Sequence, residues 1–505
     1  MQKKRFATWN WTISYTMPTV HADLGWRFDN SYARLPDGLF SRIGPTPVKE
    51  PGLVLFNSAL AEQLGLCTEG IDTSAIAQVL AGNTLPAGSE PIAQAYAGHQ
   101  FGHFTMLGDG RAVLLGEQLA PDGRRYDIQL KGSGTTLYSR RGDGRATLRA
   151  MLREYLMSEA MHHLGIPTSR SLAVVRSGQP VMRERPERGA VLTRVAASHI
   201  RVGTFEHARH FLSVNELRTL MEHTIQRHHP EAADAENPAL ELLRSMMRGQ
   251  IALIVHWMRV GFIHGVMNTD NMGLACETFD YGPCAFMNGY DPATVFSSID
   301  TGGRYAFGNQ PAIAHWNLSV LAGSLLPLIH PEEDQAIALA QAVLDEFPAL
   351  FRAAHLRMAC AKIGIAEPQT GDAALVQELY NGMQATGADH TNTFAALQLA
   401  DLSGVVPFSD EQLSSWHARW KERISATPEG PQAPRLLMQR TNPAVIPRNH
   451  VVEQVLDAAT FANDLRPLQD LLTVLATPYT GKDVPDAFRI PPPDGDAGYR
   501  TFCGT

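Results

Sequence analysis

The spacing of apolar residues changes along the chain, from short runs in the N-terminal part to a helical repeat in the C-terminal part. Residues 112–115 and 126–130 flank the turn Pro121-Asp122-Gly123, and this arrangement predicts a β-hairpin. Other short apolar runs predict strands over residues 172–176, 181–185 and 190–195. A second, shorter hairpin is predicted over residues 272–279.

One strong helical repeat interrupts the strands. Apolar side chains recur at Leu148, Met151, Leu152 and Leu156, which predicts a helix over residues 146–164. Beyond Ser213 the same spacing predicts helices over residues 214–228, 241–260, 315–329, 332–347, 349–363, 372–386 and 393–402. Strands followed by helices predict an α+β fold in two parts with a cleft between them, over residues 1–195 and 196–505.

Composition narrows the range of functions. The 505 residues include 43 basic and 51 acidic side chains and carry a net charge of -8, which argues against a general nucleic-acid binder. No run of 18 or more apolar residues occurs, so we expect no membrane-spanning helix. Five cysteines without a C-x-x-C pair predict neither a disulfide framework nor structural zinc, and favour a reducing, cytoplasmic setting.

Lys131 is unusual because the chain otherwise prefers arginine. Only seven of the 43 basic residues are lysines, and Lys131 is the only one between Lys49 and Lys362. It follows the glycine-rich turn 108–111 and precedes Gly132-Ser133-Gly134, a setting in which backbone amides and a lysine can meet phosphate oxygens. The alternative is a hairpin turn beside a solvated strand end. Glu154 favours the first interpretation, since it lies on the packed face of the helix 146–164 and needs a cationic partner.

Arginines cluster around the same region. Arg140, Arg141, Arg145, Arg149 and Arg153 follow one another closely, and single arginines on a helix are usually exposed to solvent. Arg194 differs because it lies within the apolar stretch 190–197, where a guanidinium requires a partner. Phosphate oxygens would satisfy it bidentately.

Two acidic residues and an amide follow the helix 241–260. Asp270 is placed to accept or orient a hydroxyl proton, while Asn271 and Asp280 offer oxygen ligands for a hard divalent cation. The alternative is turn chemistry, because Asn and Asp favour such loops in any case. In the order Lys131, Glu154, Asp270, Asn271, Asp280, these residues match the components of phosphoryl-transfer enzymes of the kinase type.

Two other features favour structural roles. His99 and His103 are four residues apart, but the glycines between and beside them argue against a helix, and no third metal ligand is evident. We expect hydrogen-bonded structural histidines there. Cys503 is expected to be a free thiol near the C-terminus, with a redox latch as the alternative.

The chain resembles the SelO (YdiU) family of protein adenylyltransferases, formerly considered pseudokinases. The matching segments span almost the whole chain: residues 30–33, 96–102, 108–111, 129–134, 140–145, 264–271, 280–283, 303–311 and 442–452. The resemblance implies a two-lobed, protein-kinase-like fold that binds ATP in a flipped orientation. AMP is then transferred to Ser, Thr or Tyr hydroxyls of protein substrates.

The resemblance also implies roles for individual residues. Asp270 would accept the hydroxyl proton, Asn271 and Asp280 would hold Mg²⁺, and Glu154 would pair with Lys131. The nucleotide site would consist of Gly108, Gly110, Arg111, Lys131, Asp143, Gly144, Arg194, Arg201 and Asp280. Some members pair a loop cysteine with a C-terminal Cys or selenocysteine. Cys503 stands at the terminal position here, Phe296 stands at the loop position, and Cys284 is the nearest substitute.

Two other functions remain open at this point. One is transfer of the γ-phosphoryl group to a protein or small molecule, and the other is a non-catalytic, nucleotide-binding pseudokinase scaffold. For the adenylyltransferase we expect ATP with Mg²⁺ or Mn²⁺, protein substrates and self-modification, without a role for nucleic acid or membranes.

Overall fold

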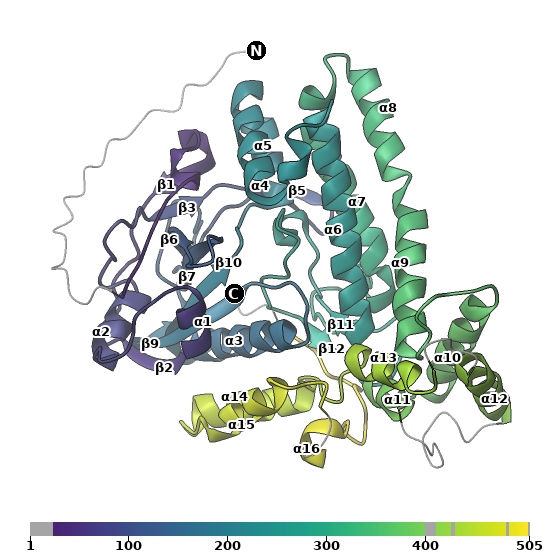
Figure 1. The fold of residues 1–505 in the computed structure, drawn as a ribbon. Helices are drawn as coiled ribbons and strands as arrows, with labels where there is room; N and C mark the ends of the chain where they lie inside the picture. The colour runs from purple at the N-terminus through teal and green to yellow at the C-terminus, as the bar shows by residue number, and fades with distance from the viewer. Residues whose placement is uncertain (1–23, 399–410, 426–429, 481–483, 503–505) are drawn as a thin grey trace.

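The computed structural model describes residues 24–398, 411–425, 430–480 and 484–502. A sheet-rich part comes first along the chain, and a largely helical part follows it (Figure 1). The architecture is therefore mixed α+β, in the order that the apolar spacing predicted.

One antiparallel sheet dominates the N-terminal part. Its strands lie in the order β1-β3-β6-β7-β10-β9-β2, with β8 paired to β10. These strands are β1 (Phe40–Arg42), β2 (Gly52–Phe56), β3 (Ile92–Gln94), β6 (Ala112–Leu119), β7 (Arg125–Lys131), β8 (Ala146–Thr147), β9 (Arg170–Met182) and β10 (Pro186–Ala196). Two small sheets stand apart from it, formed by β4 (Ala97–Gln100) with β5 (His103–Met106) and by β11 (Phe262–Ile263) with β12 (Ala285–Phe286).

The strand predictions were partly right. The hairpin around Pro121-Asp122-Gly123 is confirmed as β6 and β7, both longer than predicted. The strands predicted over residues 172–176 and 181–185 are instead one strand, β9. Gly178 lies between the two predicted strands and takes φ 69° inside β9. This glycine therefore marks an irregularity within one strand and not the end of a strand.

The prediction of a hairpin over residues 272–279 was wrong. Gly273 forms an isolated bridge with Arg201, and Thr278 forms one with Thr168. The backbone groups of this segment thus find partners elsewhere in the chain rather than across a local turn.

Helices make up most of the C-terminal part, close to the predicted ranges. The helices are α1 (Ser58–Gln63), α2 (Thr73–Leu80), α3 (Leu148–His163), α4 (Val202–Phe211), α5 (Val214–His228), α6 (Pro238–Val260), α7 (Gln310–Ile329), α8 (Glu333–Leu344), α9 (Phe347–Lys362), α10 (Asp372–Thr386), α11 (His390–Ala396), α12 (Glu411–Ser425), α13 (Ala433–Thr441), α14 (Asn449–Phe461), α15 (Arg466–Leu475) and α16 (Asp486–Arg489). Short 3-10 turns are η1 (Tyr32–Arg34), η2 (Asp37–Leu39), η3 (Pro230–Ala232), η4 (Thr269–Asn271) and η5 (Phe307–Asn309). The helix predicted over residues 393–402 corresponds to α11, and its residues 399–402 lie outside the described residues.

Helix α3 links the sheet to the rest of the molecule. Its first turn is capped by the Thr147 hydroxyl, which accepts a hydrogen bond from the Ala150 N–H. Met151, Leu152 and Leu156 are buried in a core that α6 and α14 share. Figure 1 shows α14 and α15 along the side of α3 that faces away from β6 and β7, so the C-terminal helices return to the N-terminal part.

Among the described residues, one segment is long and apolar enough to cross a membrane by length and composition. It is Phe307–Ile329, with a mean hydropathy of 1.5, and half of the tested window is buried inside the protein. Helix α7, which makes up most of it, packs against α4, α6 and α8. A helix in a protein core passes the same test, so this is weak evidence for a membrane span.

A buried ion pair fixes the start of α14. The Arg448 guanidinium is 1% exposed and lies 2.8 Å from Asp389 Oδ2, and it also donates to the Asn288 amide oxygen. Asp389 in turn caps α11 by accepting from the Asn392 N–H at 2.7 Å. The pair therefore joins the start of α14 to the start of α11.

We expect Arg448→Met to lower the free energy of unfolding by about 3–5 kcal/mol, because it leaves the Asp389 carboxylate without its cation. Urea unfolding measures the change. The matched control is Arg466→Met, which removes an exposed ion pair with Asp464 and should leave stability unchanged. Equal effects of the two substitutions would contradict the structural role given to Arg448.

Candidate active site

Lys131, the last residue of β7, pairs with Glu154 of α3. Lys131 Nζ lies 2.6 Å from Glu154 Oε2, and both side chains are less than 10% exposed. The scarce lysine and the packed carboxylate thus meet in the structure, as their places in the sequence suggested. A buried pair of this kind holds the end of β7 against α3.

Asp280 brings three cations together. Its Oδ1 lies 2.7 Å from Lys131 Nζ and 2.6 Å from Arg194 Nη1, and its Oδ2 lies 3.3 Å from Arg201 Nη1. Burial raises the pKa of the Asp280 carboxyl, but the surrounding cations outweigh burial and hold the pKa well below its ordinary value. Asp280 is therefore ionised, and it serves as the common counter-ion of the cluster.

The two arginines are rigidly held. Arg194 on β10 is 2% exposed and donates through Nε to Gln129 Oε1 at 3.2 Å. Arg201, the residue before α4, lies over the rings of both Tyr96 and Phe279, with its guanidinium carbon 4.3 and 4.8 Å from their centres. Asp280 and Gln129 are thus the partners that the buried guanidinium of Arg194 needs.

Asp270 lies in the single 3-10 turn η4, and the turn 268–271 that holds it is called the catalytic turn below, after the role that the sequence predicts for Asp270. Asp270 is 8% exposed, and its backbone carbonyl accepts from Arg201 Nη1 at 2.9 Å. Burial raises the pKa of its carboxyl to about 6. Among the described residues, none forms a hydrogen bond with Asp270 Oδ1. The neighbouring Asn271 donates its amide N–H to the Val266 carbonyl at 2.9 Å, which fixes the side chain.

The glycine-rich turn 108–111 lies beside the segment 138–139. A side chain on Gly108 would place its Cβ 2.3 Å from the Tyr138 ring, and one on Gly110 would place it 2.8 Å from the Tyr138 carbonyl. The Arg111 carbonyl accepts from the Gly132 N–H at 2.7 Å, so this turn also joins the loop after Lys131. Both glycines are therefore required by close packing, whatever else they bind.

Asp109 connects that turn to the cluster, although no pattern in the sequence singles this residue out. It accepts from Gln94 N and from Gln129 Nε2, both at 3.1 Å, and lies 3.8 Å from Arg201 Nη2. Burial raises the pKa of its carboxyl. Tyr96 and Phe279, which enclose Arg201, were missed in the same way, because an aromatic residue in a strand or loop looks like ordinary core.

Asp143 and Gly144 stand apart from the ion cluster. The Asp143 side chain is 45% exposed, lies 2.9 Å from Arg183 Nη1, and accepts from the Arg145 N–H at 2.9 Å. The Gly144 carbonyl accepts from the Gly134 N–H at 3.0 Å, and there is no room for a Cβ at Gly144. Of the described contacts, none links Asp143 to Lys131 or Asp280.

Part of the arginine cluster has a structural role. Arg149 and Arg153 of α3 both pair with Glu453 of α14, and Arg149 also lies 2.6 Å from Asp457. These arginines attach the C-terminal helices to α3 rather than facing Asp280.

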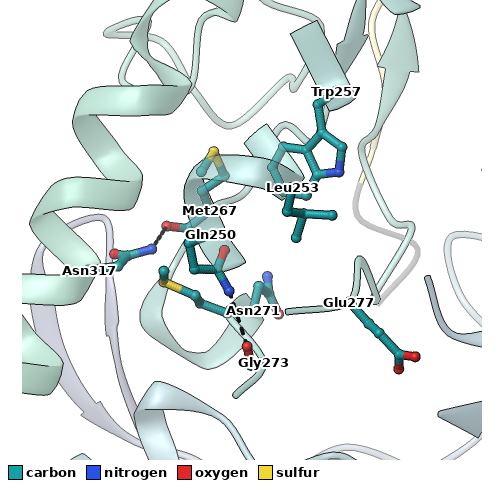
Figure 2. Close-up of a pocket in the computed structure, with 9 residues that line it drawn as sticks. Gln250, Leu253, Trp257, Met267, Asn271, Gly273, Glu277 and Asn317 are labelled. Carbon is teal, nitrogen blue, oxygen red and sulfur yellow. Dashed lines mark hydrogen bonds between the residues drawn. The ribbon is translucent and has the colours of Figure 1, made fainter. Parts of the chain in front are cut away.

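A small cavity lies behind the catalytic turn. It is lined by Gln250, Leu253, Trp257, Met267, Asn271, Met272, Gly273, Glu277 and Asn317. Figure 2 shows Gln250 donating to the Gly273 carbonyl and Asn317 donating to the Met267 carbonyl, from helices α6 and α7. With about 10 Å³ of space the cavity has room for one water molecule, so it supports the turn and does not hold a nucleotide.

The donor set suits a metal that is shared with phosphates. No group of three or more His, Cys, Asp or Glu side chains that could hold a metal occurs within residues 24–398 or the later described segments. Asn271 and Asp280 nevertheless offer oxygen atoms. Mg²⁺ is commonly bound through one or two carboxylates together with substrate phosphates, so these residues fit a metal that arrives with a nucleotide.

The cysteine positions bear on the redox latch. Cys284 is buried and free, and burial raises the pKa of its thiol to about 11. The Thr501 N–H donates to the Phe296 carbonyl at 2.8 Å, and the Thr501 hydroxyl donates to the Pro283 carbonyl at 2.7 Å. The C-terminal segment thus reaches both positions, while Cys503 itself lies outside the described residues.

Comparison with known proteins identifies the family. The family model described as "Protein adenylyltransferase SelO" matches residues 24–476. The chain belongs to the SelO family. It is 54% identical over 488 residues to "Protein nucleotidyltransferase YdiU" of Brevibacillus brevis, covering 97% of this chain and 99% of the relative. The proteins of the same description from Geobacillus kaustophilus and Nitrosococcus oceani are 53% and 51% identical, and each alignment covers 96% of this chain and 98% or more of the relative.

The raised pKa of Asp270 predicts a pH-dependent effect on stability. A carboxyl with a raised folded pKa favours the fold while it is protonated, and this contribution is lost as the pH rises through about 6. Without nucleotide or metal, we expect Asp270→Asn to stabilise the protein by about 2–3 kcal/mol near pH 8 and by about 1 kcal/mol near pH 4.5. Urea unfolding at the two pH values measures this, and an equal gain at both would assign the effect to packing instead of charge.

Proposed function

We propose that this SelO family member transfers AMP from ATP to Ser, Thr or Tyr hydroxyls of proteins, with Asp270 accepting the hydroxyl proton. The hydroxyl oxygen bonds to the α-phosphorus, the bond from the α-phosphorus to the β-phosphate oxygen breaks, and pyrophosphate leaves. The family supports the reaction class. The observation that carries the assignment of residues is the meeting of Lys131, Arg194 and Arg201 at Asp280.

The ion cluster is suited to phosphates. Lys131, Arg194 and Arg201 all contact Asp280, and Glu154 also contacts Lys131 and Arg194, so three cationic groups are gathered at one place. Asp280 now accepts from all three cations, and phosphate oxygens can take its place as their acceptor. Held in fixed positions by their neighbours, these cations stabilise the charge that develops on the leaving pyrophosphate.

Asp270 is suited to accept a proton. Its buried carboxyl has a pKa of about 6, so it is ionised near neutral pH and still basic enough to take a proton from a hydroxyl. Its Oδ1 atom accepts no hydrogen bond from any described residue. The Arg201 guanidinium, bonded to the Asp270 carbonyl, joins the proton acceptor to the phosphate-binding cations.

The remaining nucleotide contacts are part of the same proposal. Gly108, Gly110 and Arg111 would line the nucleotide, and Asp143 and Gly144 would complete its site from the loop after Lys131. Asn271 and Asp280 would hold Mg²⁺ or Mn²⁺, which when bound would neutralise phosphate charge and fix phosphate geometry. The flipped orientation of ATP would direct the β- and γ-phosphates toward Arg194 and Arg201.

We also propose a two-lobed, protein-kinase-like arrangement, with lobes over residues 1–195 and 196–505 and the nucleotide between them. It is supported by the origin of the site residues: Lys131 and Glu154 come from β7 and α3, whereas Asp270 and Asp280 come from the helical part. The pairing of a strand lysine with a helix glutamate is a component of kinase sites.

Labelled ATP separates AMP transfer from ordinary phosphorylation. We expect protein, including the enzyme itself, to retain label from α-labelled ATP and not from γ-labelled ATP, and Asp270→Ala to abolish the incorporation. Intact mass then shows whether the added group is AMP or phosphate. Label from the γ position alone would establish a kinase, and ATP binding without any modification would establish a scaffold.

Metal binding can be measured without catalysis. We expect Asp280→Asn to weaken Mn²⁺ binding at least about tenfold in the presence of a non-hydrolysable ATP analogue, because it removes the only carboxylate proposed as a ligand. Electron paramagnetic resonance of Mn²⁺ reports the bound fraction. Asp122→Asn, in an exposed turn of the sheet, is the control and should bind Mn²⁺ as the wild type does. Unchanged Mn²⁺ binding in Asp280→Asn would remove Asp280 from the metal site.

A further inference from the structure

The hairpin β4–β5 lies directly against the catalytic turn, and the proposed mechanism gives it no role. The His99 N–H donates to Thr269 Oγ1 at 2.7 Å, and the Phe101 N–H donates to Asn268 Oδ1 at 3.1 Å. These two strands form a sheet of their own, separate from the large one. The hairpin is therefore held by its hydrogen bonds to residues 268 and 269 and not by the strands of the large sheet.

Two glycines bring the hairpin, the catalytic turn and α4 into close contact. A Cβ on Gly98 would lie 2.5 Å from Asp270 Oδ1, and a Cβ on Gly203 would lie 2.0 Å from the Ala97 carbonyl oxygen. The Asp270 carboxylate is thus packed against the backbone of β4. A small movement of the hairpin would change the space around that carboxylate.

A buried ion pair ties the hairpin to α4 at this point. Glu206 of α4 is 1% exposed, and its Oε1 contacts His99 Nδ1, which makes the two an ion pair when the imidazole is protonated. Within the described residues His99 is the only ion-pair partner of Glu206, and hydrogen-bond geometry is met by neither carboxylate oxygen. A buried carboxylate is costly without a polar or cationic neighbour, and the His99 imidazole is the group that meets Glu206 among the described residues.

The His99 ring is fixed on its other sides by aromatic rings. Its centre lies 5.4 Å from the ring of Trp316 on α7 and 5.7 Å from Phe104, the residue opposite it on β5. His99 therefore links three elements, β4, α4 and α7. The sequence predicted a hydrogen-bonded structural histidine, but His99 Nδ1 meets hydrogen-bond geometry with no described residue, and the side chain is held by Glu206 and by aromatic rings instead.

We propose that His99 and Glu206 are a positioning pair, which fastens the β4–β5 hairpin to α4 and so keeps Asp270 in the geometry needed for proton transfer. This inference rests on the proposed function, in which Asp270 is the proton acceptor. His99 and Glu206 act through the hairpin and do not touch the reacting atoms.

Steady-state kinetics of AMP transfer test the pair. We expect His99→Gln and Glu206→Ala each to lower kcat about 10- to 100-fold, since misplacement of a catalytic group by about 1 Å has effects of this size. KM for ATP should stay within about threefold of wild type, because the phosphate-binding cations are untouched. Glu206→Gln keeps the size and the polarity of the side chain that contacts His99 and should retain more activity than Glu206→Ala.

The double variant and a control on the same hairpin separate this role from general destabilisation. We expect His99→Gln/Glu206→Ala to be no slower than the slower single variant, because both remove one shared interaction. His103→Gln changes the exposed histidine of β5 and should have wild-type kcat. Additive losses in the double variant, unchanged kcat in both single variants, or a parallel rise of KM for ATP would overturn the proposal.

Hydrogen exchange gives a readout that does not depend on the reaction. Residues 97–106 should exchange faster in His99→Gln and Glu206→Ala than in His103→Gln, while the strands β6 and β7 stay protected. If wild-type protein transferred no AMP, the proposed function would fail, yet the exchange data would still show whether the pair holds the hairpin. Unchanged hydrogen exchange over residues 97–106 would directly contradict the proposal that the pair holds the hairpin.

Discussion

The carboxylate of Asp280 is shared by Lys131, Arg194 and Arg201, and the arrangement of the site depends on this sharing. Each of these cations is at least nine-tenths buried, and without a common anion their mutual repulsion and lost hydration would be unfavourable. Asp280 takes φ 62°, in the left-handed region that few residues other than glycine adopt, and its side chain reaches all three. The backbone is thus held in an uncommon conformation at the residue that gathers the charges.

The same interaction joins the two parts of the chain. Lys131 ends a central strand of the sheet, and its partner Glu154 belongs to α3, whereas Asp280 follows the catalytic turn in the helical part. Arg201 lies at the start of α4 and contacts both Asp280 and the backbone of Asp270. A change of the anion at the centre, from Asp280 to the phosphates of a nucleotide, would therefore be felt on both sides of the site. In the proposed function, this arrangement would couple nucleotide binding to the placement of Asp270 without any distant signal.

Much of the fold could be predicted because the sequence patterns that determine it are local. Helix α3 and the β6–β7 hairpin follow from spacing and turn residues, and the meeting of Lys131 with Glu154 follows from scarcity of lysine and the packed face of one helix. The contact between Lys131 and Asp280 spans 149 positions, so no local pattern reports it. The hairpin expected over residues 272–279 failed for the same reason, because its partners are distant residues. Asp143 was grouped with the site through family resemblance alone, and the structure pairs it with Arg183.

The buried charged groups among the described residues differ in how many partners they share. Arg448 with Asp389 and Arg170 with Glu159 are one-to-one pairs, in which each charge faces a single charge of opposite sign. Around Asp280 three cations share one carboxylate and Arg201 Nε has no hydrogen-bond partner among the described residues. At Asp270 the Oδ1 atom has no described donor, so both places keep bonding capacity unused. Unused capacity in a buried site lowers stability, and a chain retains it where a ligand supplies the missing partners. By that criterion the turn that carries Asp270 and the cluster around Asp280 form one site, and the His99–Glu206 pair, whose carboxylate lacks good hydrogen-bond geometry, lies at its edge.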